Sequence, residues 1–417
     1  MVLPEHSVLS PDQLKMQTAL ADFIRNTPEG READTILRAC VHCGFCTATC
    51  PTYQLLGDEL DGPRGRIYLI KQILEGHAPT ARTQLHLDRC LTCRACETTC
   101  PSGVKYGRLA DIGRKIVDER VPRALFERLQ RWGLRTVLPY TSRFATLLSL
   151  GRAARPLLPP KLKRSIISAE SAGAWPAARH SRRMLVLDGC VQPALAPAIN
   201  AATARVLDRL GISLVQTAGT GCCGAVSYHL TAQEEGLYFM RRLIDAWWPH
   251  IEAGAEAIVM TASGCGAMVK EYGHLLRGDP AYAEKATRVA AMTRDIGEIL
   301  ADADLSTLSC HRRRVAFQSP CTLQHGQQLN GVVERVLGKL GFELTPVPDA
   351  HLCCGSAGTY SILQERLSQR LLANKLKALT SGGPELIATA NIGCLAHLKS
   401  RAEIPVVHWI ELLGSAG

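Results

Sequence analysis

The sequence contains no run of apolar residues long enough to cross a membrane as a helix. Such a helix needs roughly 18–20 consecutive apolar residues. The first residues, "MVLPEHSVLSPDQLK", carry a proline and acidic side chains where a secretory signal would have a basic and then an apolar segment. These two absences together predict a chain that stays in the cytoplasm.

What the sequence has in quantity is cysteine, with 17 in 417 residues. Hydrophobic content of 46% and charged content of 21% are ordinary for a globular protein, and the length allows two or three domains. In a reducing compartment, so many cysteines are expected to be metal ligands or redox centres rather than disulfides.

The first eight cysteines form two runs, "CVHCGFCTATCP" and "CLTCRACETTCP", with 39 residues between Cys50 and Cys90. Both runs follow the ferredoxin pattern for [4Fe–4S] clusters, in which the fourth cysteine of each run ligates the other cluster. Two structural zinc sites are the alternative, and two complete runs that each end in proline argue against them. The predicted ligand sets are Cys40, Cys43, Cys46 and Cys100 for cluster 1, and Cys90, Cys93, Cys96 and Cys50 for cluster 2.

Two helices are predicted around these runs. Ile67, Ile70, Ile73 and Leu74 recur at helical spacing within "GPRGRIYLIKQILEG", and "LADIGRKIVDERV" has the same character. The interpretation is a helix-rich dicluster 4Fe-4S ferredoxin-type domain over residues 1–121.

Residues 122–183 are predicted to form a basic linker. From Arg120 to Arg183 there are 14 Lys and Arg residues but only two acids, Glu127 and Glu170, and this excess is larger than the net charge of +10 for the whole chain. A solvated, partly helical linker is one interpretation. A basic amphipathic surface for an anionic membrane or an acidic partner is the other. No recognition motif suggests nucleic acid.

The rest of the chain contains an internal repeat. Twice in the chain, a cysteine is followed after 31 intervening residues by the adjacent cysteines of a Cys-Cys-Gly triplet, and after 41 or 39 further intervening residues by another cysteine. The offset between the copies is 131 residues for the first three cysteines and 129 for the last. Such self-similarity indicates a duplicated unit. The predicted units are cysteine-rich CCG repeat 1 over residues 184–310 and repeat 2 over residues 311–417.

Each copy has the same predicted element order, β-α-β-α-β, with the cysteines just beyond the carboxyl ends of strands, where parallel α/β sheets build ligand sites. Adjacent cysteines can present two thiolates to one metal centre, and the following glycine permits positive φ or a close backbone approach. The alternative is that these are buried structural cysteines without a metal. It would require such cysteines to occur in the same order in both copies. The candidate metal ligands are Cys190, Cys222, Cys223 and Cys265 in repeat 1, and Cys321, Cys353, Cys354 and Cys394 in repeat 2.

One segment resembles a nucleotide-binding motif. "GTGCCG", from Gly219 to Gly224, matches the dinucleotide fingerprint, but the second copy reads "DAHLCCG" and shares only the CCG. No flavin is therefore expected on this chain. Cys310, the last residue of repeat 1, has no counterpart in the repeated cysteine pattern and is predicted to have no role.

A dicluster ferredoxin module followed by two C-x₃₁-CCG units resembles a cysteine-rich family that includes heterodisulfide reductase subunits and the iron–sulfur subunits of lactate and glycerol-3-phosphate dehydrogenases. The stretches "RACVHCGFCTATCPTYQLLGDELDGPRGRIYLIKQ", "NAATARVLDRLGIS", "TASGCGAMVKEYG" and "HLCCGSAGTY" are most similar to the iron–sulfur subunits of bacterial glycolate oxidases (glycolate dehydrogenases).

This resemblance implies a multidomain α+β and α/β oxidoreductase subunit with two [4Fe-4S] clusters. It would take electrons from FAD-binding partner subunits that oxidise glycolate to glyoxylate and pass them toward a quinone, at the cytoplasmic face of the inner membrane. It also implies that the chain alone is inactive. A disulfide or quinone reductase, and an assembly scaffold with zinc in the repeats, are the competing hypotheses.

The chain departs from the heterodisulfide reductases at the end of each repeat. Those proteins end each unit in C-x-x-C, whereas Met268 and His397 stand at the corresponding places here. A [4Fe–4S] cube or a tetrahedral zinc on four thiolates is then expected instead of a non-cubane cluster, with His397 as a further candidate ligand.

Overall fold

The structure is a computed structural model, and it describes residues 16–157, 159, 171–308 and 312–414. Its backbone divides into two units, Met1–Arg123 and Ala124–Gly417. Among the helices of the described residues, none combines the length and the apolar character needed to cross a bilayer.

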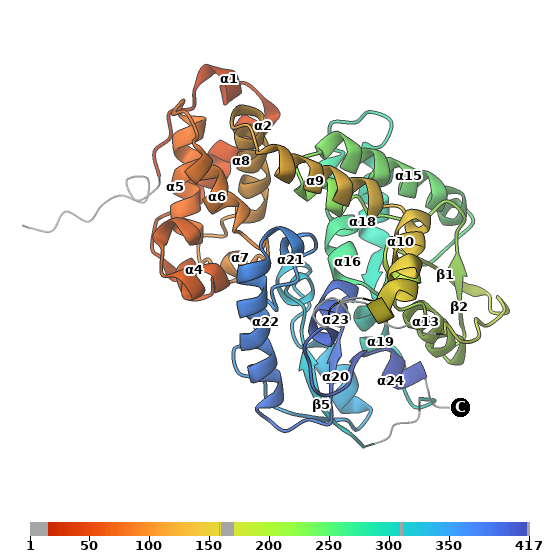
Figure 1. The fold of residues 1–417 in the computed structure, drawn as a ribbon. Helices are drawn as coiled ribbons and strands as arrows, with labels where there is room; N and C mark the ends of the chain where they lie inside the picture. The colour runs from red at the N-terminus through yellow and green to blue at the C-terminus, as the bar shows by residue number, and fades with distance from the viewer. Residues whose placement is uncertain (1–15, 158, 160–170, 309–311, 415–417) are drawn as a thin grey trace, which may run out of the picture. The chain divides into compact units, whose positions relative to one another are not determined.

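In its described part, the N-terminal unit is built from helices without strands (Figure 1). The predicted helices are present as α5 and α8, and Ile67, Ile70, Ile73 and Leu74 lie in the core between them. The helices are α1 (Asp22–Arg25), α2 (Pro28–Ala39), α3 (Phe45–Ala48), α4 (Pro51–Leu56), α5 (Pro63–Leu74), α6 (Ala81–Asp88), α7 (Ala95–Thr99) and α8 (Tyr106–Arg120).

The second unit begins with two helices, α9 (Leu125–Val137) and α10 (Thr141–Ala154), and continues into two parallel sheets. The first sheet has the order β2-β1-β3-β4, and the second has the matching order β6-β5-β7-β8. The strands are β1 (Arg182–Val186), β2 (Ile212–Gln216), β3 (Ile258–Met260), β4 (Thr293–Asp295), β5 (Arg314–Gln318), β6 (Glu343–Leu344), β7 (Leu386–Thr389) and β8 (Val406–His408).

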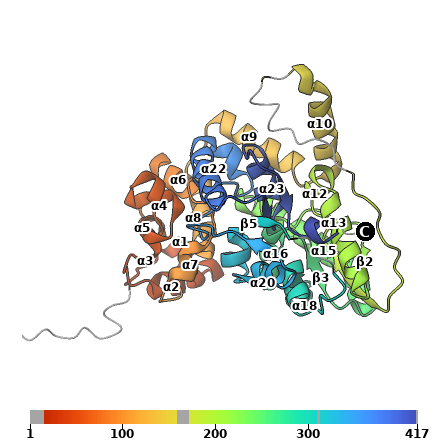
Figure 2. The same cartoon turned by 90° about the horizontal axis from the view of Figure 1, so that it is seen from below.

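Helices cover both faces of each sheet. In the second copy, α20 and α22 lie on opposite sides of β5 in both views (Figure 1 and Figure 2). The helices of the first copy are α12 (Gln192–Leu195), α13 (Ala198–Arg209), α14 (Ala225–His229), α15 (Gln233–Glu252), α16 (Ser263–Lys270), α17 (Tyr272–Leu275), α18 (Ala283–Met292) and α19 (Ile296–Ala301). Those of the second are α20 (Val332–Lys339), α21 (Tyr360–Leu363), α22 (Glu365–Thr380), α23 (Ile392–Lys399) and α24 (Glu411–Gly414).

The two copies share one hydrophobic core, to which Val186 and Val259 contribute from the first sheet and Val315 and Ile387 from the second. A buried hydrogen bond also joins them, since the ring Nε2 of His408 lies 2.8 Å from the carbonyl oxygen of Thr261. Neither copy is therefore packed as an independent body.

The fold class is confirmed, a helix-rich ferredoxin-like domain followed by two α/β units. Each helix that follows the first strand of a copy is closed by a glycine with positive φ, Gly211 or Gly341. The prediction missed a fourth strand in each copy, because β4 has the polar sequence Thr-Arg-Asp and β8 is only three residues long. Residues 160–170 of the predicted basic linker, and Cys310, lie outside the described residues.

Candidate iron–sulfur and thiol sites

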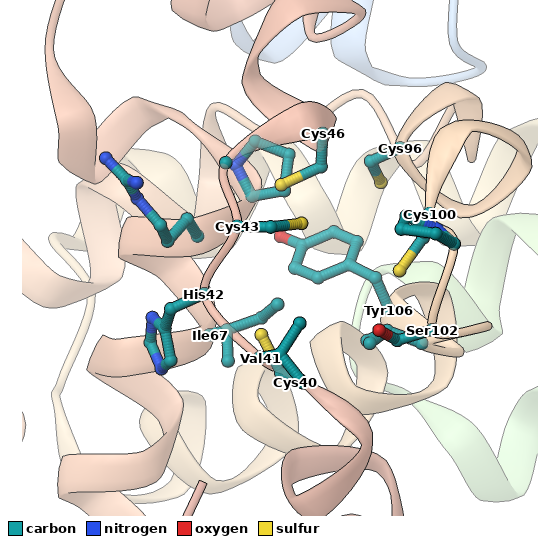
Figure 3. A pocket seen from close by; sticks show the side chains of 15 residues that line it. Cys40, Val41, His42, Cys43, Cys46, Ile67, Cys96, Cys100, Ser102 and Tyr106 are labelled. Carbon is teal, nitrogen blue, oxygen red and sulfur yellow. The ribbon is translucent and has the colours of Figure 1, made fainter. Parts of the chain in front are cut away.

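The eight N-terminal cysteines line two cavities in the first unit. The first cavity contains Cys40, Cys43 and Cys46 from one run together with Cys100 from the other. Figure 3 shows these sulfur atoms around a common space beside the ring of Tyr106. The second cavity reverses the arrangement and is lined by Cys90, Cys93, Cys96 and Cys50. Each cavity thus receives the first three thiols of one run and the last thiol of the other run, and Cys96 also borders the first cavity.

The two cysteine loops share an unusual backbone conformation. His42 and Gly44 have positive φ in the first loop, and Thr92 and Arg94 have positive φ at the matching positions 50 residues later. Positive φ is costly for residues other than glycine and persists where the surrounding structure requires it. Both loops are therefore curled in the same way, which turns three thiols toward one cavity.

The charges around the two cavities differ. In the first, burial raises the pKa of the Cys46 thiol to about 11, with further contributions from Cys40, Cys100 and Cys43. In the second, burial also disfavours the thiolate of Cys90, but the guanidinium groups of Arg66 and Arg114 outweigh it and lower its pKa. The second cavity is therefore the more cationic of the two.

Arg66 is fixed in place by a buried hydrogen-bond network. Its guanidinium donates to the backbone carbonyl of His86 at 2.8 Å, to the hydroxyl of Thr52 at 3.2 Å and to the carboxylate of Asp61 at 3.4 Å. The same carboxylate receives Arg89 at 2.8 Å. Arg66 and Asp61 are almost completely buried, and the carboxylate holds the guanidinium beside the thiols of Cys50 and Cys90.

The donor sets fit iron–sulfur clusters. Each cavity contains the four thiols of one predicted ligand set, and four thiols are the ligands of a [4Fe–4S] cluster. The ring of Tyr106 and the thiol of Cys96 line both cavities, so the two sites are adjacent.

In the second cysteine-rich copy the four candidate ligands are buried and close together. The Sγ atoms of Cys321 and Cys353 are 3.8 Å apart, and those of Cys354 and Cys394 are 3.5 Å apart. Cys353 and Cys354 also interact through their side chains. The structure therefore links all four thiols into one cluster.

In the first copy the four cysteines form the same chain of contacts. The side chain of Cys222 interacts with those of Cys190 and Cys223, and Cys223 interacts in turn with Cys265. Cys222 and Cys223 are buried, whereas Cys190 and Cys265 are only partly covered. The first copy is therefore the more accessible of the two thiol groups.

The glycine of each CCG triplet allows the chain to turn against a helix. Gly224 has φ of 86°, and a Cβ there would lie 2.6 Å from the carbonyl oxygen of Gly236; Gly355 has φ of 90°, and a Cβ would lie 2.7 Å from that of Ser368. In both copies the glycine N–H donates to the thiol two residues earlier, at 3.4 Å. The expected need for positive φ and close approach is confirmed at both glycines.

His397 and Met268, at the places of the missing fifth thiol, each have other contacts. The Nε2 atom of His397 lies 3.1 Å from the hydroxyl of Ser368, and that hydroxyl donates to the carbonyl of Gly355. Burial lowers the pKa of His397. Met268 packs in the hydrophobic cluster that includes Cys223. His397 thus supports the CCG turn through Ser368.

The sequence analysis missed a buried lysine in the second copy. The ammonium of Lys375 donates to the carbonyl oxygens of Ala350 at 3.1 Å and Asp349 at 3.3 Å. Burial lowers its pKa, and the four neighbouring cysteines act in the opposite direction. Like Arg66, Lys375 lies within a helix at a position that the sequence alone would assign to the surface, so only the fold reveals its place beside the thiols.

In a comparison with known proteins, two protein-family models match parts of the chain. The model of a 4Fe-4S dicluster domain matches residues 36–104, and that of a cysteine-rich domain matches residues 184–270 and 315–399. The chain is 59% identical to the "Glycolate oxidase iron-sulfur subunit" of Escherichia coli over 96% of its length and 99% of that protein.

More distant relatives match as well. A "Probable glycolate oxidase iron-sulfur subunit" of Bacillus subtilis is 30% identical over 94% of this chain and 96% of that protein. "Lactate utilization protein A" of Bacillus licheniformis is 30% identical over 52% of this chain and 92% of its own length. The similarity to the glycolate oxidase subunits therefore covers nearly the whole chain, whereas that to the lactate protein covers about half.

Proposed function

Because the chain belongs to the family of glycolate oxidase iron–sulfur subunits, we propose that it is the electron-transfer subunit of a glycolate-oxidising complex. An FAD-binding partner subunit would convert glycolate to glyoxylate, and the two electrons removed would pass through this chain to a quinone. The two protons released would leave from the flavin subunit, since this chain carries no motif for flavin or for the hydroxy acid.

The observation that carries the proposal is the pair of adjacent four-thiol cavities. The [4Fe–4S] clusters that such thiols bind accept and donate one electron at a time. Cys40, Cys43, Cys46 and Cys100 would hold one cluster, and Cys90, Cys93, Cys96 and Cys50 the other. Adjacent one-electron sites suit a subunit that divides a two-electron oxidation into single steps.

The surrounding side chains support the same task. Ile67 and Tyr106 are buried and line the first cavity. Arg66 and Arg114 stabilise negative charge at the second cavity, which would favour the reduced state of a cluster there.

The two CCG copies would each hold a further metal centre on their four cysteines, either an iron–sulfur cluster or zinc. The complex would act at the cytoplasmic face of the inner membrane, where a quinone can be reached. Activity would require the flavin subunit, so the isolated chain would not oxidise glycolate.

The test is reduction of the clusters by substrate. When the anaerobically purified complex receives glycolate, we expect the EPR signals of reduced [4Fe–4S] clusters to appear, and we expect none when the isolated chain receives glycolate. Cys43→Ser should abolish one cluster and electron transfer to a quinone analogue, whereas Cys310→Ser should leave both intact.

Two results would contradict the proposal. One is turnover of glycolate by the pure, flavin-free chain. The other is a complex whose clusters stay oxidised while glycolate is consumed. A complex that reduces its clusters with lactate but not with glycolate would instead assign the chain to a lactate dehydrogenase, which the partial similarity to the lactate protein makes the second candidate.

A further inference from the structure

Helix α9 (Leu125–Val137) presents its apolar side to solvent. Leu125, Phe126, Leu129 and Trp132 are all exposed, with Phe126 at 78% and Trp132 at 59%. These residues recur at i, i+1, i+4 and i+7, which places them along one side of the helix. In an ordinary surface helix this side faces the core. We name these four residues the α9 face.

The polar side of α9 is turned toward the protein instead. Glu127 pairs with Arg131 at 3.1 Å, and Arg135 approaches Glu235 on α15 at 3.7 Å. The Arg131 side chain is only 13% exposed. All residues of α9 are described, and none of them is buried. Within the second unit, the ion pair of Arg135 connects α9 to α15, and the four apolar side chains remain exposed.

The charge around this face indicates what covers it. Residues 124–157 contain six arginines and a single acid, Glu127. Arg128 is exposed within α9, and Arg143 is exposed on α10, where Leu147 and Leu150 are also exposed. Apolar residues with tryptophan on one side and arginines around them are typical of helices that lie in the interface of an anionic membrane.

We propose that α9 is an interfacial helix that inserts Leu125, Phe126, Leu129 and Trp132 among the lipids of an anionic membrane, with the neighbouring arginines at the headgroups. This inference rests on, and deepens, the proposed attachment of the complex to the inner membrane. It identifies the contact as a partly inserted helix of this chain. The exposed guanidinium groups of Arg128 and Arg143 favour an anionic lipid surface over a neutral apolar partner.

The test is flotation of the full, cluster-loaded chain with vesicles of phosphatidylcholine, with and without phosphatidylglycerol. We expect flotation with the anionic vesicles only, and weaker flotation at high salt. The double variant Phe126→Ser/Trp132→Ser should lower the partition coefficient by roughly 100-fold, because two large apolar side chains no longer enter the lipid. Arg128→Gln should lower it by a few-fold, about the effect of one basic residue.

The matched control is Ile362→Ser, which removes another exposed apolar side chain from the same unit and should float as the parent protein does. Brominated lipid should quench part of the tryptophan fluorescence, and Trp132→Phe should remove that part. Equal flotation of the parent and the double variant would overturn the inference, as would flotation with neutral vesicles alone.

Two other results would also overturn it. In one, the double variant still binds lipid, but size-exclusion chromatography shows that it no longer associates with the flavin subunit or with a second copy of this chain. In the other, the double variant changes the melting temperature of the ferredoxin unit, which would mean that this unit, and not lipid, covers the α9 face. In the complex with the flavin subunit, reduction of the clusters by glycolate in detergent should be the same for the double variant and the parent. A failure of that reduction in the parent would instead count against the proposed function.

Discussion

In the second cysteine-rich copy an ammonium group lies beside the four thiols, whereas the first copy has a leucine at the matching position. Gly236 and Ser368, whose carbonyls face the two CCG glycines, are 132 residues apart, and the same offset pairs Lys375 with Leu243. Leu243 is buried in the cluster that contains Cys223. The copies therefore share their cysteine pattern and turn geometry but differ in the charge available to balance thiolates.

The two copies of the duplicated unit thus share some residues around the thiols and differ at others. The four cysteines and the glycine are constrained together, because losing one disrupts the group of thiols. The residue at the position of Lys375 or Leu243 only modifies the electrostatics. We infer that the second copy is the better site for an anionic metal–thiolate centre, since a buried positive charge offsets part of its negative charge.

The largest effect is expected from the glycines that the copies share. Gly355→Ala and Gly224→Ala each place a Cβ within 2.7 Å of a backbone oxygen at a positive φ. Each should destabilise its turn by about 2–4 kcal/mol and remove the metal from its own copy only. Metal analysis of the two variants measures this. Gly338→Ala is the control, because a Cβ there meets nothing within 4 Å. Loss of metal from both copies in one variant would show that the copies do not bind separately.

The ferredoxin unit contains a similar contrast between a buried and an exposed cation. Arg66 is 1% exposed at the second cavity, whereas the Arg64 side chain at the first is 38% exposed and pairs with Glu59. Arg66→Gln should lower the midpoint potential of the second cluster by on the order of 100 mV, because a buried charge is poorly screened. Arg64→Gln should have a much smaller effect. Equal shifts in an EPR redox titration would contradict this account.

Lys375→Met tests the charge difference between the copies directly. It should weaken metal binding in the second copy by about 10–100-fold, as replacing an outer-shell partner usually does. Binding in the first copy should not change. The rate at which each copy transfers its metal to a chelator measures metal binding in both copies. The control is Lys377→Met, at an exposed position of the same helix. Unchanged release from the second copy would mean that Lys375 serves only to bind the carbonyls of Asp349 and Ala350.

The smallest effect concerns the buried histidine that joins the copies. Burial lowers the pKa of His408 to about 4, below the roughly 6.5 of an unfolded chain. The unfolded state therefore binds the proton first as the pH falls, so stability decreases between these two values. We expect a loss of about 1 kcal/mol between about pH 7 and pH 5.5.

His408→Gln removes this titration while leaving an amide that can donate to Thr261. The melting temperature of the variant should thus depend less on pH over that range than that of the parent. The same dependence in both proteins would show that His408 does not contribute to it.

Much of this arrangement could be predicted from the sequence. Cysteine spacing is a local pattern and directly reflects ligand geometry, so the three-plus-one grouping at Cys40 and at Cys90 could be inferred. Helical periodicity gave α5, and the repeat gave the matching strands β1 and β5. These features can be predicted because each depends on residues that are close together in the chain.

The remainder depends on contacts between distant residues. Lys375 and Arg66 look like solvent-exposed residues of helices, and only tertiary packing places them beside thiols. His397 was a candidate ligand, and its contact with Ser368, 29 residues away, could not be inferred. Helix α9 was recognised as part of a basic stretch, but the exposure of its apolar side could not be inferred from the sequence.

The most direct test of the central claim is the iron and zinc content of the anaerobically purified full chain, measured together with the EPR spectrum of its reduced form. The account predicts at least about eight iron atoms per chain and the spectrum of two interacting [4Fe–4S] clusters. Additional iron or zinc would report on the CCG copies. Zinc without iron, or iron that gives no reducible cluster signal, would contradict the assignment of this chain as an electron carrier.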